Sequence, residues 1–278
     1  MPQRNLDLPT VEGFGREWRA FDQSNLAKSE YDELFERYFS IFPFDALPPH
    51  AEGFDLGCGS GRWASGVAPR VGLLHCIDPA EDALAVARAR LCDMQNVRFH
   101  LAAADEMPLP PASQDFGYSL GVLHHIPDTR KALADCAAAL KPGAPFLLYL
   151  YYALENRPLW FRALWMATNA VRSGVCRLPF AARKAVTDAI AAMVYWPLAR
   201  SAALLERVGA DVSTLPLNDY RRSSFYTMRT DSLDRFGTRL EQRFTRAEIE
   251  EMMSSAGFEN IRFRESSPYW VACGEKKC

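Results

Sequence analysis

A short glycine-rich stretch, Asp55-Leu56-Gly57-Cys58-Gly59-Ser60-Gly61, constrains the fold of this chain more than any other feature. An apolar segment leads into it and a helical pattern leads out of it. Glycines at alternate positions accept positive φ and let the backbone approach a ligand, because no Cβ intervenes. Such strand–loop–helix turns lie at the carboxyl edge of a parallel sheet, where nucleotide-like ligands bind. The stretch therefore predicts an α/β fold that binds a nucleotide-like molecule.

The spacing of the glycines discriminates between cofactors. The pattern is G-x-G-x-G, whereas the dinucleotide fingerprint requires G-x-G-x-x-G and would need a glycine at Arg62. No Gly-Lys-Ser/Thr follows, so the loop is not a P-loop. An NAD-type oxidoreductase on a similar sheet is disfavoured by this spacing and is kept as an alternative.

The glycine stretch resembles the first motif of class I S-adenosylmethionine-dependent methyltransferases, and three later stretches resemble further motifs of that family in the usual order. Residues 104–110 resemble the acidic loop that meets adenine. Residues 115–128 resemble the fourth strand and following loop of the branch that includes ubiquinone-type C-methyltransferases and many small-molecule O- and N-methyltransferases. Residues 140–145 resemble the turn before the fifth strand. The resemblance covers roughly residues 51–150 and 245–275.

The resemblance implies a doubly wound α/β fold with a seven-stranded, mostly parallel, Rossmann-like sheet and an antiparallel last strand. The residues agree with it. Val71–Ile77 is an apolar strand, and residues 97–101 alternate like an edge strand with one wet face. Residues 146–150 are continuously apolar, as in a central strand. Thr245 and Glu248 form a capping box that starts a late helix.

Three regions are expected. Residues 1–50 form an N-terminal segment covering the cofactor site, loose over 1–13 and helical from Phe14 to Phe42. Residues 51–150 and 245–278 form the methyltransferase core. Residues 151–244 form a mostly helical insertion after the fifth strand, which we expect to act as a lid and substrate-binding element.

The cofactor implied by the resemblance is S-adenosyl-L-methionine. Asp78 ends the second strand about 20 residues after the glycines, where an acidic side chain can accept hydrogen bonds from ribose hydroxyls. Asp105 matches the residue that meets adenine in the family. The full set of predicted cofactor-binding residues is Trp18, Asp55, Gly57, Cys58, Gly59, Gly61, Asp78, Pro79, Asp105, Glu106, Met107 and Gly121.

Methyl transfer from a sulfonium is an in-line displacement, so the protein mainly positions the nucleophile and excludes water. A base is needed only where the nucleophile carries a proton that must leave. His124 and His125 follow the fourth strand, and a histidine can accept a proton near neutral pH. His125, ahead of His124, is the predicted base; a purely positional role for either is the alternative.

The insertion is basic, with 13 Arg and 1 Lys against 8 acidic residues, a formal charge of +6 that leaves −8 on the rest of the chain. Residues 220–231 mix arginines, hydroxyls and aromatics without a clean helical or strand period, a composition more typical of binding loops. Arginine suits carboxylate or phosphate, so we expect a small acceptor bearing an acidic group. The predicted substrate residues are Tyr152, Arg221, Arg222, Tyr226 and Arg229.

Other features set limits. The net charge of −2 gives no case for nucleic-acid binding. Seven scattered cysteines without paired spacing predict no metal site and a cytoplasmic protein. No apolar run reaches about 20 residues, so no membrane span is expected. The apolar insertion helices leave three options open: a pocket, a homodimer contact or a membrane surface. A non-catalytic cofactor-binding scaffold is the remaining alternative to an enzyme.

Overall fold

The computed structural model describes residues 5–278, whose contacts divide the chain into two compact units. The sheet unit contains the chain up to Asp22, residues 33–153 and residues 240–278. The helical unit contains residues 23–32 and 154–239. The helical unit therefore consists mainly of the segment between the fifth and sixth strands, where the sequence predicts an insertion.

The sheet unit is built on seven strands in the order β3-β2-β1-β4-β5-β7-β6. Strands β1 to β5 are parallel, and β7 is antiparallel to both β5 and β6. This topology confirms the predicted doubly wound fold, with β3 at one edge. The strands are β1 (Glu52–Leu56), β2 (Leu73–Asp78), β3 (Val97–Leu101), β4 (Phe116–Leu120), β5 (Pro145–Tyr149), β6 (Phe258–Phe263) and β7 (Val271–Lys276).

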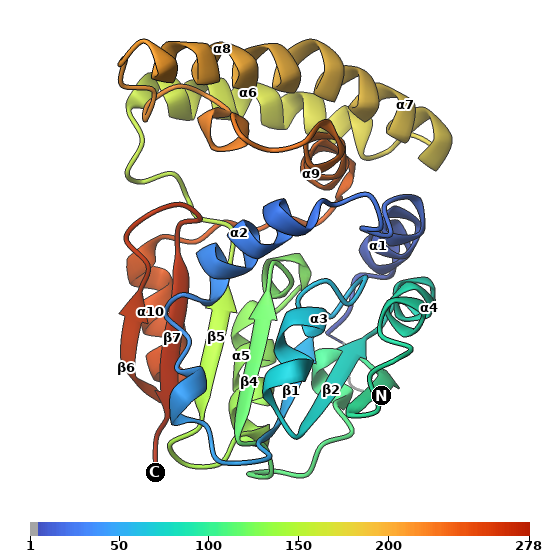
Figure 1. Ribbon diagram of the computed structural model, residues 1–278, viewed down its shortest axis with the longest axis vertical. Coiled ribbons are helices and arrows are strands. Elements are labelled where there is room, and N and C mark those ends of the chain that lie inside the picture. The colour runs from blue at the N-terminus through green and yellow to red at the C-terminus, as the bar shows by residue number, and fades with distance from the viewer. Residues whose placement is uncertain (1–4) are drawn as a thin grey trace. The chain divides into compact units, whose positions relative to one another are not determined.

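Helices cover both faces of the sheet (Figure 1). The core between the sheet and α5 (Thr129–Ala139) and α10 (Arg246–Ser255) contains fully buried side chains such as Leu133, Phe146 and Met253. The other face carries α3 (Ala64–Val67) and α4 (Glu81–Arg90), and α1 (Leu8–Ala20) packs on α4. The helices cover the faces of the sheet. The residues at the carboxyl ends of β1, β2 and β4 remain at its edge and line the cavity described below.

Two glycines inside the central strands are explained by aromatic packing. Gly53 pairs with Phe116, and Phe54 pairs with Gly117, across β1 and β4. A Cβ on Gly53 would lie 2.4 Å from the Phe116 ring, and one on Gly117 would lie 2.4 Å from the Phe54 ring. Each phenylalanine therefore covers the glycine of the neighbouring strand, and the intrinsic weakness of glycine in a strand is offset by the burial of two rings.

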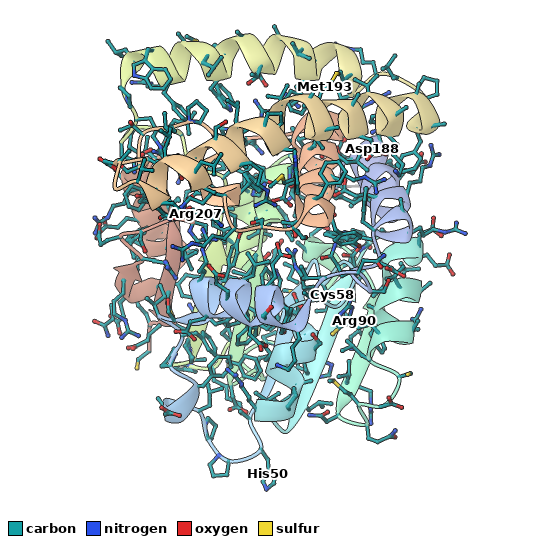
Figure 2. The ribbon with its side chains drawn as sticks, turned by 45° about the horizontal axis from the view of Figure 1, so that its top comes forward. His50, Cys58, Arg90, Asp188, Met193 and Arg207 are labelled. Carbon is teal, nitrogen blue, oxygen red and sulfur yellow. The ribbon has the colours of Figure 1, made fainter. Side chains whose placement is uncertain are left out.

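The helical unit contains α6 (Leu159–Val175), α7 (Phe180–Ile190), α8 (Trp196–Arg207) and α9 (Phe225–Gly237). A π-helical turn, η5 (Ala191–Tyr195), joins α7 to α8 into one long helix. Figures 1 and 2 show this long helix running alongside α6. A small core of Val175, Tyr195, Ala199, Met228 and Phe236 holds the helices together.

The predicted single helix over Phe14–Phe42 is wrong. The structure has α1, which begins at Leu8, and α2 (Lys28–Phe39), separated by a turn in which Gln23 has φ +66°. Asp7 caps α1 by accepting a hydrogen bond from the Thr10 N–H, so the predicted loose segment 1–13 is helical from Leu8; its residues 1–4 lie outside the described part. The helical pattern that follows the glycine stretch corresponds to α3 and a 3₁₀ turn over 68–70, and the strand predicted over 71–77 corresponds to β2.

The segment 220–231, which the sequence pattern predicts to be irregular, contains the first half of α9. Ser224 caps this helix by accepting from the Thr227 N–H, and Glu30 accepts from the Ser224 N–H and the Thr227 hydroxyl. Inward-facing hydroxyls are satisfied locally: Ser232 donates to the Thr187 carbonyl. Buried residues of α9 include Thr227, Thr230 and Ser232, so the hydrophobic periodicity typical of a helix is not visible in the sequence.

Candidate active site

The glycine loop after β1 adopts a conformation that only glycine accepts easily. Gly57, Gly59 and Gly61 have φ of +78°, +54° and +71°. A Cβ on Gly57 would lie 2.4 Å from the Val122 methyl groups, and a Cβ on Gly59 would lie 2.8 Å from Nε1 of Trp18. Close approach by Val122 and Trp18 thus requires glycine at two positions, in addition to the backbone conformation.

A cavity of about 900 Å³, including space open to solvent, lies beside this loop. It is lined by α1 and the residues before it, by the glycine loop, by the end of β2, and by the loops after β3 and β4. Cys58, labelled in Figure 2, belongs to this lining. The predicted residues that line the cavity are Trp18, Gly57, Cys58, Gly59, Asp78, Pro79, Gly121 and His125. The cavity therefore lies where the sequence predicts the cofactor.

Asp78 is fixed at the cavity wall by two backbone donors. Its Oδ2 accepts from the Gly59 N–H at 2.9 Å, and its Oδ1 accepts from the Ala80 N–H at 2.8 Å. Burial raises the pKa of Asp78 to about 6, although both backbone hydrogen bonds act to lower it. The carboxylate is ionised at neutral pH and presents further lone pairs to a ligand hydroxyl.

Ligand affinity should therefore depend on the charge of Asp78. If the ionised carboxylate accepts from ribose hydroxyls, protonation below the pKa of about 6 weakens binding. We expect the affinity for S-adenosylhomocysteine to fall roughly tenfold between pH 7 and pH 5 in calorimetric titrations. Asp78→Asn should bind more weakly at pH 7 and show a flat profile. If the affinity of Asp78→Asn fell as steeply between pH 7 and pH 5, the pH dependence of binding would belong to another group.

A second acceptor belongs to Asp105, in the 3₁₀ turn after β3; its neighbour Ala104 lines the cavity, but Asp105 itself does not. Its Oδ2 accepts from the Asn5 N–H at 2.9 Å, while its buried Oδ1 has no hydrogen-bond partner within residues 5–278. Asn5 also exchanges two hydrogen bonds with the Asp128 backbone, at 2.7 and 2.8 Å. The N-terminal segment is thereby fastened over the site, and Oδ1 is an acceptor suited to an amino group.

Asp55 lies in β1, directly before the glycine loop, and does not line the cavity. It is 1% exposed, and burial raises its pKa to about 8, while the neighbouring Tyr118 hydroxyl lowers it. The carboxyl is therefore protonated at neutral pH. Its predicted contact with the cofactor stays a prediction.

The raised pKa of Asp55 has a consequence for stability. Between about pH 4, where the unfolded carboxyl titrates, and about pH 8, the folded protein retains a proton that the unfolded chain releases. Stability from this group is thus lost as the pH rises through that window. Asp55→Asn should gain stability relative to the wild type by about 1.4 kcal/mol per pH unit, levelling off above pH 8. Denaturant unfolding at several pH values measures this difference, and a constant difference would contradict it.

The two histidines after β4 have different surroundings. His125 lines the cavity, its ring is 4.9 Å from Phe14, and its Nδ1 lies 2.6 Å from the Leu240 carbonyl oxygen. A carbonyl only accepts, so Nδ1 carries the hydrogen and Nε2 is the basic nitrogen. His124 is fully buried, outside the cavity lining, and stacked on Tyr151 at 3.9 Å. Burial, followed by the charges of His125 and Arg243, holds the pKa of His124 well below its usual range, so it is neutral.

The remaining predicted residues are not among those that line the cavity. Tyr152 pairs with Phe244 beyond β5, with its ring 5.5 Å from Tyr269. Four others have partners within the helical unit: Arg221 and Arg222 bind Glu206, Arg229 binds Asp188, and the Tyr226 hydroxyl accepts from the Gln23 N–H. Gly61, Asp105, Glu106 and Met107 are also outside the lining. The roles of all these residues stay predictions.

Several residues that line the cavity were not predicted from the sequence. Residues 5–7, Thr10 and Val11 precede the aromatic pair Phe14 and Trp18 on the same wall. Asp7 followed closely by Pro9 is a helix-start signal that could have placed the beginning of α1 here. The contribution of Val122 could not be recognised, because it depends on how β4 lies beside the glycine loop.

Comparison with known proteins identifies the family. A model described as "Methyltransferase domain" matches residues 54–148. An uncharacterized methyltransferase of Mycobacterium bovis is 31% identical over 149 residues, an alignment that covers 52% of this chain and 71% of that protein. The chain belongs to the class I S-adenosylmethionine-dependent methyltransferases.

This methyltransferase is also similar to a curated O-methyltransferase and to a solved structure. A ubiquinone biosynthesis O-methyltransferase of Aromatoleum aromaticum is 35% identical over 105 residues, which cover 37% of this chain and 43% of that protein. The alignments with the first curated relatives span less than half of each relative's length. A solved S-adenosylmethionine-dependent methyltransferase of Methanosarcina mazei has a TM-score of 0.50 at 16% identity, covering 84% of this chain and 95% of that one. The last likeness is one of fold.

Proposed function

We propose that this methyltransferase transfers the methyl group of S-adenosyl-L-methionine to a small-molecule acceptor. The observation that carries the proposal is the convergence of the glycine loop, Asp78 and His125 on one cavity. The named relative from Aromatoleum aromaticum, an O-methyltransferase of ubiquinone biosynthesis, supports a small acceptor. An oxygen, nitrogen or carbon nucleophile is compatible with the site.

The cavity fits the cofactor of the family. Asp78 and Trp18, both in the lining, would accept from the ribose and cover the loop at Gly59, respectively. Asp105, next to the lining residue Ala104, would accept from the adenine amino group through its unpartnered Oδ1. When bound, the sulfonium supplies an already activated methyl group. The residues around it bind, orient and exclude water, which are the main requirements of an in-line displacement.

Within this proposal His125 accepts the proton of the acceptor nucleophile. The Leu240 carbonyl fixes the ring and its tautomer, so that Nε2 is the base. Phe14 packs against the imidazole and Trp18 lies on the same wall, and both limit the access of water. An acceptor without a removable proton would need only the positioning provided by these residues.

We further propose that the acceptor carries an acidic group. The basic composition of residues 151–244 supports this proposal. Its support is weakened by the ion pairs of the predicted arginines. Arg229 makes a bidentate contact with Asp188, at 2.8 and 3.0 Å. Burial alone would raise the pKa of Asp188, but hydrogen bonds from Arg229 and Lys184 hold it below its usual value. This pair is a stable structural element of the helical unit.

The proposed function is tested by methyl transfer into fractionated cell extract. The protein is incubated with methyl-labelled S-adenosylmethionine and either the small-molecule fraction or the macromolecular fraction. We expect label in a small molecule together with an equal amount of S-adenosylhomocysteine. Label confined to protein or nucleic acid would contradict a small acceptor, and no turnover with any fraction would favour the scaffold alternative. Retention of the labelled product on an anion exchanger tests for the acidic group.

A further inference from the structure

The helical unit exposes an unusual amount of apolar surface. Fourteen of the seventeen large apolar side chains that are exposed on the described chain lie within residues 159–208. Leu159 is 78% exposed, Met193 71% and Leu204 60%. Scattered exposed apolar residues are common on proteins, but a concentration of this kind marks an interaction surface.

The orientation of α6 is the opposite of that expected for a helix facing water. Every exposed residue of α6 except Arg162 is apolar or glycine, including Leu164 and Met166. Its less exposed side carries polar groups beside apolar ones such as Trp165 and Val175. Arg172 donates to the Thr238 carbonyl at 2.7 Å and to Asn169 at 2.7 Å. Because these polar groups are hydrogen-bonded inside the unit, the exposed apolar face is the one available to a partner.

The long helix formed by α7, η5 and α8 has the same character. Its exposed residues are apolar apart from Ser201 and Arg207. It runs alongside α6, as Figures 1 and 2 show, with Met193 and Arg207 labelled in Figure 2. Trp160 on α6 and Trp196 on α8 are 51% and 40% exposed. Tryptophan rings of this kind are typical of the boundary between hydrocarbon and lipid headgroups.

The charge around this surface is positive. Residues 159–208 contain seven basic residues and two acidic ones, Asp188 and Glu206. Both acids are neutralised within the unit: Asp188 by Lys184 and Arg229, and Glu206 by Arg221 and Arg222. Arg162, Arg177 and Arg207 are exposed. A partner that matches this surface is both apolar and anionic.

We infer that the exposed faces of α6 and α7–α8 bind the surface of a membrane rich in anionic phospholipids. Amphipathic helices with leucine and tryptophan on one face and arginine beside it lie in the plane of the interface, and each basic residue there gains energy from anionic headgroups. No helix of residues 5–278 meets the length and hydropathy needed to cross a bilayer, so the contact is peripheral. A second copy fits less well, because a symmetric contact would bring two basic surfaces together.

The test is flotation of the full chain with vesicles. We expect binding to vesicles of equal parts phosphatidylcholine and phosphatidylglycerol, weaker binding at high salt, and a blue shift of tryptophan fluorescence. Leu164→Glu and Leu204→Glu should each lower the affinity about tenfold. Leu101→Glu is the matched control, since Leu101 is 58% exposed on β3 in the sheet unit and should leave binding unchanged.

A second pair of variants isolates the charge. Arg162→Gln and Arg207→Gln leave the apolar face intact and should each weaken binding to the anionic vesicles roughly fivefold. No flotation of the wild type at low salt would overturn the inference. An equal loss of vesicle binding in Leu101→Glu would also overturn it. So would a dimer, detected by light scattering and dissociated by Leu164→Glu, in a protein that does not bind vesicles. These measurements do not depend on methyl transfer, so their failure leaves the proposed function intact.

Discussion

His125→Ala is expected to lower turnover by roughly 10²–10⁴-fold when the acceptor nucleophile carries a proton, with cofactor affinity nearly unchanged. The reason is that the ring lines the cavity in a fixed tautomer, with Nδ1 held by the Leu240 carbonyl at 2.6 Å. Removal of the ring takes away the basic nitrogen and leaves the glycine loop and Asp78 in place. Steady-state kinetics with the identified acceptor, together with calorimetric titration of S-adenosylhomocysteine, measure the two effects separately.

Two variants sharpen this result. His125→Asn retains a donor toward the Leu240 carbonyl but has no base, so it should be as slow as the alanine variant. His124→Phe preserves the buried ring stacked on Tyr151 and should keep most of the activity, because His124 is outside the cavity lining. Full activity in His125→Asn would show that the residue positions groups and accepts no proton. Equal loss in His124→Phe would mean that the ring pair acts as a packed unit.

Gly59→Val is expected to abolish detectable binding of S-adenosylhomocysteine. Gly59 has φ +54°, and a Cβ there would lie 2.8 Å from Nε1 of Trp18, on the wall of the cavity. A branched side chain would displace the tryptophan, occupy ligand space and strain a backbone that also donates to Asp78. Three separate requirements for glycine coincide at this one residue, which is why the expected effect is large.

The control for this variant is Gly143→Val. Gly143 has a similar φ of +78°, but nothing lies within 4 Å of its Cβ position, and it is not part of the cavity. The two variants should lose comparable stability from backbone strain, which thermal melting measures, whereas only Gly59→Val should lose the ligand. Normal binding by Gly59→Val would show that the ligand does not contact this loop.

Local patterns predicted the sheet well. Alternation over 97–101 identified an edge strand, and continuous apolarity over 146–150 identified a central one, because the burial of each face is encoded in each strand separately. The position of Asp78 at the end of β2 was also predictable from spacing. These features depend on residues that are close in sequence.

Long-range packing was less predictable. The break between α1 and α2 depends on a turn at Gln23, and the start of α9 depends on Glu30, almost two hundred residues away. The sequence could rank His125 only slightly ahead of His124, since their difference arises from the Leu240 carbonyl and the burial of one ring. The arginines predicted to bind substrate have acidic partners whose proximity follows from helix packing alone.

We expect the cavity beside the glycine loop to be the S-adenosylmethionine site, and calorimetric titration of the wild-type protein is the decisive measurement. S-adenosylhomocysteine and NAD are titrated separately into the full chain. We expect one molecule of S-adenosylhomocysteine to bind per chain, and no heat of binding with NAD. Binding of NAD without binding of S-adenosylhomocysteine would contradict it.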